Sequence, residues 1–283
     1  MAKRILTASI ALVITLFAIL ATPPFISALL LAVAIICALE IAKLTGIKAV
    51  TAGIIAAYTI FATLLIDAAV MTIHLTMPDR FNFDIGVTLI MAIAFWLAGS
   101  YSLIVWKPNY NKMAYGIVFW VCGSSLSAIY LHLQSFGEGS FAPNLLLLAI
   151  VPLWVGDSLA YFIGKKWGKR KLAPSISPKK TIEGAVANLV GCLVTAVAVG
   201  QWLEIPLTAS IAVGFSTGIL GQVGDLLQSR FKRRADVKDS GTLLPGHGGF
   251  LDRLDSFLFS SVPSLLLLLV LSPELFHVKH WPF

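Results

Sequence analysis

Charged residues are scarce in this sequence. Asp, Glu, Lys and Arg make up only 12% of the 283 residues, whereas 58% are hydrophobic and the mean hydropathy is +0.87. Soluble domains carry about 25% charged residues, so one water-soluble core would not accommodate so much apolar surface. The shortage argues against a disordered chain and a nucleic-acid-binding domain, and it predicts a polytopic membrane protein.

Paired cysteines and the motifs of soluble nucleotide-binding enzymes are also missing. Cys37, Cys122 and Cys192 stand singly in apolar runs, which excludes a disulfide scaffold and a CxxC metal site and predicts buried thiols. The chain contains no GxxxxGKS/T, GxGxxG or HExxH motif. Any nucleotide chemistry must therefore use a different kind of site.

Long apolar runs are abundant. A spanning helix needs about 20 apolar residues. The first run is expected to be a retained helix rather than a signal peptide, because no A-x-A site follows it before Pro23. The fold class is therefore predicted to be an all-α polytopic membrane protein with about nine transmembrane helices. The nine runs are residues 5–22, 25–42, 49–70, 85–105, 114–134, 144–163, 183–203, 206–228 and 256–272.

The positions of the Lys and Arg residues agree with these nine crossings. If the N-terminus is cytoplasmic, nine crossings place every Lys and Arg except Arg80 and Lys279 on the cytoplasmic side. The positive-inside rule therefore predicts a cytoplasmic N-terminus and an outside C-terminus. Polar groups are sparse in residues 1–140, where Glu40 is expected to be an interfacial residue. We expect 1–140 to be scaffold helices that face lipid or a dimer partner, and 141–283 to be the catalytic region.

Asp157 lies inside an apolar run, where a carboxylate needs a partner or a water-filled cavity. A strongly cationic loop follows and ends in a turn at Ser177, after which Thr181 is expected to cap the next helix. Lys179 and Lys180 thus precede a helix N-terminus, whose amides favour anions. The pattern predicts phosphate binding by Ser177, Lys179 and Lys180. The alternative is a basic anchor that attracts anionic lipid headgroups.

The run 206–228 has glycines three or four residues apart, which predicts a helix face packed closely against its neighbours. Asp225 follows, and on a continuing helix Ser229 and Lys232 share its face. Simple pairing of Asp225 with Lys232 is one alternative; participation in a phosphate site is the other. The glycines are Gly214, Gly218, Gly221 and Gly224.

The segment 238–256 is the richest in polar chemistry. Glycines flank His247, and such a turn lets backbone amides approach a phosphate. Asp252 and Asp255 face one way on a helix, and with Asp225 they could form an oxygen-rich Mg²⁺ site. Cations near them would neutralise phosphate oxygens. These residues predict a metal-dependent enzyme acting on phosphates, whereas the alternative is a solvated loop with ordinary ion pairs.

The run from Ser229 to Asp255 resembles the signature of the phosphatidate cytidylyltransferase (CDP-diacylglycerol synthase) family. It contains Ser-x-apolar-Lys-Arg, Lys-Asp, apolar-Pro, His-Gly-Gly and Asp-Arg-apolar-Asp without a gap. The stretch from Asp157 to Gly184 is similar to a second shared region. The matching signature positions are Ser229, Phe231, Lys232, Arg233, Lys238, Asp239, Gly241, Leu244, Pro245, His247, Gly248, Gly249, Phe250, Asp252, Arg253, Leu254 and Asp255.

The resemblance implies that CTP and phosphatidic acid react to give CDP-diacylglycerol and pyrophosphate. It also implies Mg²⁺, with a monovalent cation such as K⁺ as a second ion. The partners are then CTP and membrane lipid, with no nucleic acid, and a homodimer is a further hypothesis. The protein is expected in the cytoplasmic membrane with its site facing the cytoplasm.

Roles are assigned to the matching residues as hypotheses. The metal ligands are Asp225, Asp252 and Asp255. The catalytic set is these carboxylates with Lys232, Arg253 and His247. The substrate-binding set is Ser177, Lys179, Lys180, Ser229, Arg233, Lys238, Asp239, Gly248, Gly249 and Asp157.

Other functions remain to be distinguished. A CDP-alcohol phosphotransferase needs an Asp-Gly dipeptide, and none occurs here. An enzyme that uses an archaeal ether-lipid phosphate, or a CTP-dependent lipid kinase, is closer in chemistry. A lipid-phosphate transporter would need polar groups on both sides of the membrane, whereas here they gather on the predicted cytoplasmic side.

Overall fold

The computed structural model describes residues 23–48, 51–53, 56, 60, 86–105, 110–133, 144–244 and 248–276. In these parts of the chain, six helices are long and apolar enough to cross a membrane: Phe25–Thr45, Ala114–His132, Leu145–Trp167, Ile182–Trp202, Leu207–Arg234 and Leu251–Leu271. The prediction of an integral, multi-pass helical protein is confirmed. The predicted span 5–22 and most of 49–70 lie outside the described residues, so the number nine and the orientation stay predictions.

Contacts within the chain divide it into two units. The first contains α2 (Pro23–Thr45), α4 (Gly86–Val105), most of α5 (Tyr110–Leu133) and the segment Ser240–Asp252. The second contains residues 144–239 and continues from Arg253. The sequence had assigned 141–283 to one region, whereas Ser240–Asp252 groups with the N-terminal helices in the structure. The elements of the second unit are α6 (Leu145–Trp167), β1 (Lys171–Ala173), β2 (Ser177–Thr181), α7 (Ile182–Trp202), α8 (Leu207–Phe215), η1 (Ser216–Leu220), α9 (Gly221–Arg234), most of α10 (Leu251–Leu271) and η2 (Pro273–Phe276).

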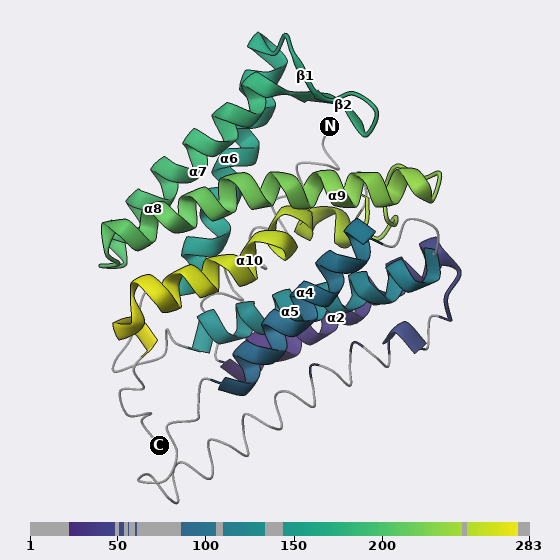
Figure 1. Cartoon of the computed structure of the whole chain (residues 1–283), viewed down its shortest axis with the longest axis horizontal. Helices are drawn as coiled ribbons and strands as arrows, with labels where there is room; N and C mark the ends of the chain where they lie inside the picture. Colours follow the sequence, from purple (N-terminus) through teal and green to yellow (C-terminus); the bar gives the residue numbers. More distant parts are fainter. Residues whose placement is uncertain are drawn as a thin grey trace, which may run out of the picture. The chain divides into compact units, whose positions relative to one another are not determined.

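In the first unit, α4 and α5 pack side by side (Figure 1). Glycine makes this possible, because a Cβ at Gly123 would lie 2.6 Å from the carbonyl oxygen of Ala92. Trp120 and Leu126 of α5 are fully buried. The helix α2 begins at Pro23, and proline is favoured in a first turn because its missing N–H has no partner there.

In the second unit, α6 and α7 pack along each other and are joined by the antiparallel ribbon β1–β2 (Figure 1). The ribbon is a small departure from the all-α prediction. Pro174 and Pro178 disfavour a continuous helix between α6 and α7. Thr181 ends the ribbon and caps α7 as predicted, since its Oγ1 accepts the Gly184 amide at 3.1 Å.

The helices α8 and α9 continue one into the other through the π-helical turn η1 (Figure 1). The predicted glycine face is confirmed as a packing surface. A Cβ at Gly218 would lie 3.1 Å from the Leu189 Cα of α7, and one at Gly224 would lie 2.7 Å from the Asp255 carbonyl oxygen of α10. The long helix ends at Arg234, beyond the predicted limit of residue 228.

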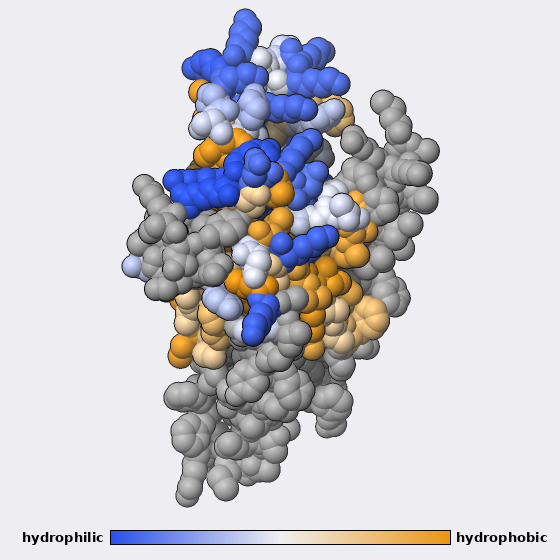
Figure 2. Space-filling view, turned by 90° about the vertical axis from the view of Figure 1, so that its right-hand side faces the viewer, coloured by the Kyte–Doolittle hydropathy of each residue, from blue (hydrophilic) through white to orange (hydrophobic). Residues whose placement is uncertain are grey.

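Polar and apolar surfaces are separated in the second unit. Phe162, Val194 and Trp202 are more than 60% exposed, as side chains that face lipid would be. On the face drawn in Figure 2, hydrophilic side chains gather at the end that carries the β1–β2 ribbon. The unit therefore combines an apolar belt with one polar end.

We predict that Gly224→Ala destabilises the protein by about 1–3 kcal/mol, because the added methyl group meets the backbone of α10. Thermal unfolding in detergent measures the effect. Gly53→Ala is the control, since a Cβ there meets only Leu39 Cδ2 at 3.8 Å, an ordinary contact. Equal melting temperatures for the two variants would contradict the packing role.

Candidate active site

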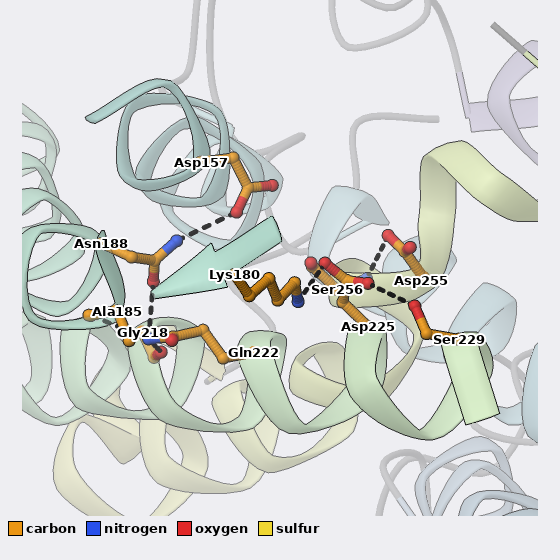
Figure 3. Close-up of polar contacts among 10 residues, drawn as sticks. All are labelled: Asp157, Lys180, Ala185, Asn188, Gly218, Gln222, Asp225, Ser229, Asp255 and Ser256. Carbon is orange, nitrogen blue, oxygen red and sulfur yellow. Dashed lines mark hydrogen bonds and ion pairs between the residues drawn. The ribbon is translucent and has the colours of Figure 1, made fainter. Parts of the chain in front are cut away.

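Asp157 of α6 begins a row of polar side chains in the second unit. Asn188 of α7 donates its Nδ2 to Asp157 Oδ1 at 2.9 Å, and Gln222 of α9 donates to Asn188 Oδ1 at 3.1 Å (Figure 3). Gln222 also donates to the Gly218 carbonyl oxygen at 2.7 Å, inside the π-helical turn. The Asp157 carboxylate therefore has the partner that its position requires. The side-chain amides of Asn188 and Gln222 connect it from α6 to α7 and α9.

Asp225 of α9 makes an ion pair with the ribbon and accepts a hydrogen bond within its own helix. Lys180 Nζ lies 2.5 Å from Asp225 Oδ2, and Ser229 Oγ donates to Asp225 Oδ1 at 3.2 Å (Figure 3). The predicted alternative was a pair between Asp225 and Lys232. The ion pair with Lys180 joins Asp225 to the segment predicted to bind phosphate, so two distant polar segments form one cluster.

Asp255 of α10 belongs to the same cluster. Its Oδ1 accepts the Ser256 amide at 2.9 Å, and Asp225 is its neighbour across the helix contact that Gly224 permits (Figure 3). Two facing carboxylates repel unless cations lie between or beside them. Lys180 contacts Asp225, and Lys232 lies within electrostatic range of Asp255. The two carboxylates lie between α9, α10 and the ribbon, and the ammonium groups of Lys180 and Lys232 lie near them.

The carboxylates of Asp225 and Asp255 fit a divalent cation by their chemistry. Mg²⁺ is usually held by one or two carboxylates together with water and substrate phosphates. Lys180 already places one positive group on Asp225 Oδ2. Within the described part of the chain, no three His, Cys, Asp or Glu side chains are grouped as a ready-made metal site. The set of three ligands that includes Asp252 stays a prediction.

Asp252 is held by backbone amides in the first unit. Its Oδ2 accepts the Ser240 amide at 2.7 Å and the Gly249 amide at 2.9 Å. Gly248 has φ +83°, a conformation that glycine adopts without strain, and its carbonyl oxygen accepts the Leu244 amide at 2.9 Å. In the part of the predicted glycine-rich turn that the structure describes, the Gly249 amide therefore donates to Asp252.

Glu40 is the polar residue that sequence reasoning assigned wrongly, as an interfacial group. It is only 8% exposed, and its carboxylate accepts the Phe250 amide at 2.8 Å and the Leu251 amide at 3.0 Å. Asn188 and Gln222 were missed as well. The available signal was a single acidic or amide side chain in an otherwise apolar run, as for Asp157.

The remaining predicted residues are spread around these groups. Arg253 is exposed on α10 and lies within electrostatic range of Asp157. Arg233 is exposed and donates to the Val237 carbonyl oxygen at 2.7 Å. Ser177 and Lys179 lie on β2, where Lys179 is exposed. Lys238 and Asp239 are exposed after α9. His247 lies outside the described residues.

The fold is that of a multi-pass membrane protein, and carboxylates meet an ammonium group in its polar cluster. Its sequence matches the cytidylyltransferase family over residues 2–271. The chain belongs to this family.

Known proteins agree with this assignment. A phosphatidate cytidylyltransferase of Bacillus subtilis (strain 168) is 34% identical over 285 residues, covering 96% of this chain and 98% of that protein. One from Staphylococcus aureus (strain COL) is 45% identical over 129 residues, covering 45% of this chain and 49% of that protein. One from Staphylococcus haemolyticus is 44% identical over 127 residues, covering 44% and 48%. The resemblance seen in the sequence is confirmed.

We predict that Lys180→Met makes the substrate-free protein bind Mn²⁺, a probe for Mg²⁺, roughly two- to fivefold more tightly. The ammonium group no longer competes for Asp225 Oδ2, and a partly exposed ion pair is worth up to about 1 kcal/mol. To measure the affinity, Mn²⁺ is titrated into the protein in a non-ionic detergent. The electron paramagnetic resonance signal reports the free Mn²⁺ at each step. Lys179→Met, which removes the same charge from an exposed neighbour, is the control. Weaker or unchanged binding in Lys180→Met would contradict the arrangement.

Proposed function

We propose that this chain transfers the cytidylyl group of CTP to the phosphate of phosphatidic acid, forming CDP-diacylglycerol and pyrophosphate. The family assignment and a relative of that name that aligns over 96% of the chain support this activity. The observation that carries the proposal is the 2.5 Å ion pair between Lys180 and Asp225. It brings a basic ribbon, suited to phosphates, against carboxylates suited to a metal.

The reaction is a single displacement at phosphorus. A phosphate oxygen of phosphatidic acid attacks the α-phosphorus of CTP in line, a new P–O bond forms, and the bond to the bridging oxygen breaks. The electron pair of that bond leaves with pyrophosphate. The task of the protein is then to position two anions and to neutralise their charge.

The cations of the cluster perform that neutralisation. Lys180 moves from Asp225 to a phosphate oxygen when substrate enters, and exposed Lys179 adds a second ammonium group on the same strand. Arg253 and Arg233 offer planar donors that bind a phosphate through two bonds. These roles follow from charge and placement and extend the substrate-binding prediction.

Mg²⁺ is the proposed cofactor, with a monovalent cation such as K⁺ as the second ion. Asp225 and Asp255 would hold it in the second unit, and Asp252 is the third predicted ligand. When bound, Mg²⁺ supplies charge neutralisation on the phosphate oxygens and a template for their orientation. Ser229 orients Asp225 through the hydrogen bond that it donates at 3.2 Å.

The proposed site faces the cytoplasm, because CTP is a soluble cytoplasmic molecule and the cationic loops are predicted to lie there. The lipid phosphate would enter from the membrane surface, which the exposed apolar belt of α6 and α7 adjoins. A homodimer remains a hypothesis. The glycine face that suggested it packs within the chain, against α7 and α10.

Pyrophosphate release by the purified protein tests the function. With CTP and Mg²⁺, we expect release only when phosphatidic acid is present, and cytidine-labelled CTP should give a labelled lipid. A CTP-dependent kinase would instead release CDP, an ether-lipid enzyme would prefer that substrate, and a transporter would move phosphatidic acid in vesicles without pyrophosphate. Any of these three results would contradict the proposal.

Asp225→Asn should lower the rate of pyrophosphate release by about 10- to 100-fold or more, because one proposed ligand loses its charge. Asp236→Asn is the matched control. Asp236 is exposed with φ +56°, a conformation that asparagine tolerates, so its replacement removes the same charge without strain. A folded Asp225→Asn variant with near-normal activity would remove Asp225 from the site.

A further inference from the structure

Glu40 of α2 makes contacts that an interfacial glutamate would not make. Its side chain is buried, and it reaches a segment that lies more than 200 positions away in the sequence. Oε1 accepts the Phe250 amide at 2.8 Å, and Oε2 accepts the Leu251 amide at 3.0 Å and the Ser240 hydroxyl at 2.9 Å. The carboxylate thus receives three donors from the signature segment.

Two of these donors stand at the start of α10. The first amides of a helix have no acceptor within the helix, and a nearby side chain usually satisfies them. Here Glu40 supplies that acceptor from another helix, and its negative charge also interacts favourably with the positive end of the α10 dipole. Glu40 therefore acts as a cap for the start of α10.

The same turn fixes Asp252. Ser240 connects the two carboxylates, because its hydroxyl donates to Glu40 and its amide donates to Asp252 Oδ2 at 2.7 Å. The Gly249 amide also donates to Asp252 Oδ2, at 2.9 Å. Ser240 and Asp252 are at most 9% exposed. The orientation of Asp252 thus depends on a backbone that Glu40 holds.

Glycines leave room for this arrangement. A Cβ at Gly241 would lie 2.8 Å from Glu40 Oε1, and a Cβ at Gly249 would overlap Ser240 Oγ and Glu40 Oε2. These two signature glycines therefore serve the approach of a protein carboxylate. The amides of Phe250 and Leu251 are bound to Glu40 in this arrangement.

We propose that Glu40 is a positioning residue: by capping α10 and holding the segment 240–251, it orients Asp252 for metal binding. The proposal rests on the proposed function for its effect on turnover. Its structural part does not, because the cap exists without substrate. Glu40 acts through Asp252 and the backbone and contacts no reacting atom.

Hydrogen–deuterium exchange tests the cap without turnover. In Glu40→Gln, the amides of Phe250 and Leu251 should exchange about 10- to 100-fold faster, because they lose a charged acceptor. In Ser240→Ala, both amides still have Glu40 as their acceptor, so their protection against exchange should change little. Glu274→Gln is the control, because Glu274 is exposed and lies beyond the other end of α10. In this variant, the amides of Phe250 and Leu251 should exchange as fast as in the wild type. Unchanged exchange in Glu40→Gln would overturn the cap.

The dependence on Mg²⁺ then separates positioning from a purely structural role. Removing a residue that orients a metal ligand typically costs 10–100-fold in metal affinity or activity. Glu40→Gln should therefore raise the Mg²⁺ concentration for half-maximal pyrophosphate release by about that factor, while saturating CTP does not restore the rate. Faster exchange with an unchanged Mg²⁺ requirement would overturn the positioning role.

Failure of the proposed function would look different from failure of this inference. Wild-type protein that released no pyrophosphate would refute the reaction, yet exchange at Phe250 and Leu251 would still report on the cap. If Glu40→Gln does not fold, Glu40→Asp replaces it. The shortened carboxylate keeps the charge but reaches the two amides poorly, so their exchange should still rise, and unchanged exchange would overturn the cap.

Discussion

A carboxylate in an apolar helix is stable only when donors or cations surround it, and this constraint shapes the contacts of Asp157, Asp225 and Glu40. Asp157 accepts a hydrogen bond from the Asn188 amide, Asp225 forms an ion pair with Lys180, and Glu40 accepts hydrogen bonds from backbone amides. Each of these contacts joins segments that are distant in the sequence. The polar groups therefore fix which helices meet, and the same carboxylates are then available for phosphate and metal chemistry.

Glycine is the second requirement, because small residues let helices approach until short polar side chains can meet. Gly224 allows α9 to approach the backbone of α10 near Asp255, and Gly218 allows the π-helical turn to lie against Leu189 of α7. Gln222 extends from this junction to Asn188. Close packing and polar chemistry thus depend on the same stretch of helix, in which Gly224 directly precedes Asp225.

Much of this could be predicted from the sequence. Hydropathy identified the membrane helices that the structure describes, the glycine spacing indicated a packing face, and Thr181 was recognised as a cap. These features depend on local periodicity. The partner of Asp225 and the role of Glu40 could not be found in this way, because both depend on contacts between segments far apart in the chain. The ribbon β1–β2 was missed because its strands are too short to show alternation.

The account requires no covalent intermediate, since positioning and charge neutralisation are sufficient for transfer to phosphatidic acid. The stereochemical course at the α-phosphorus, followed with chiral α-thio-CTP, tests this claim most directly. A single in-line displacement inverts the configuration at phosphorus, and inversion is the predicted result. Retention would require two successive displacements through a nucleotidyl-enzyme, and it would contradict the mechanism.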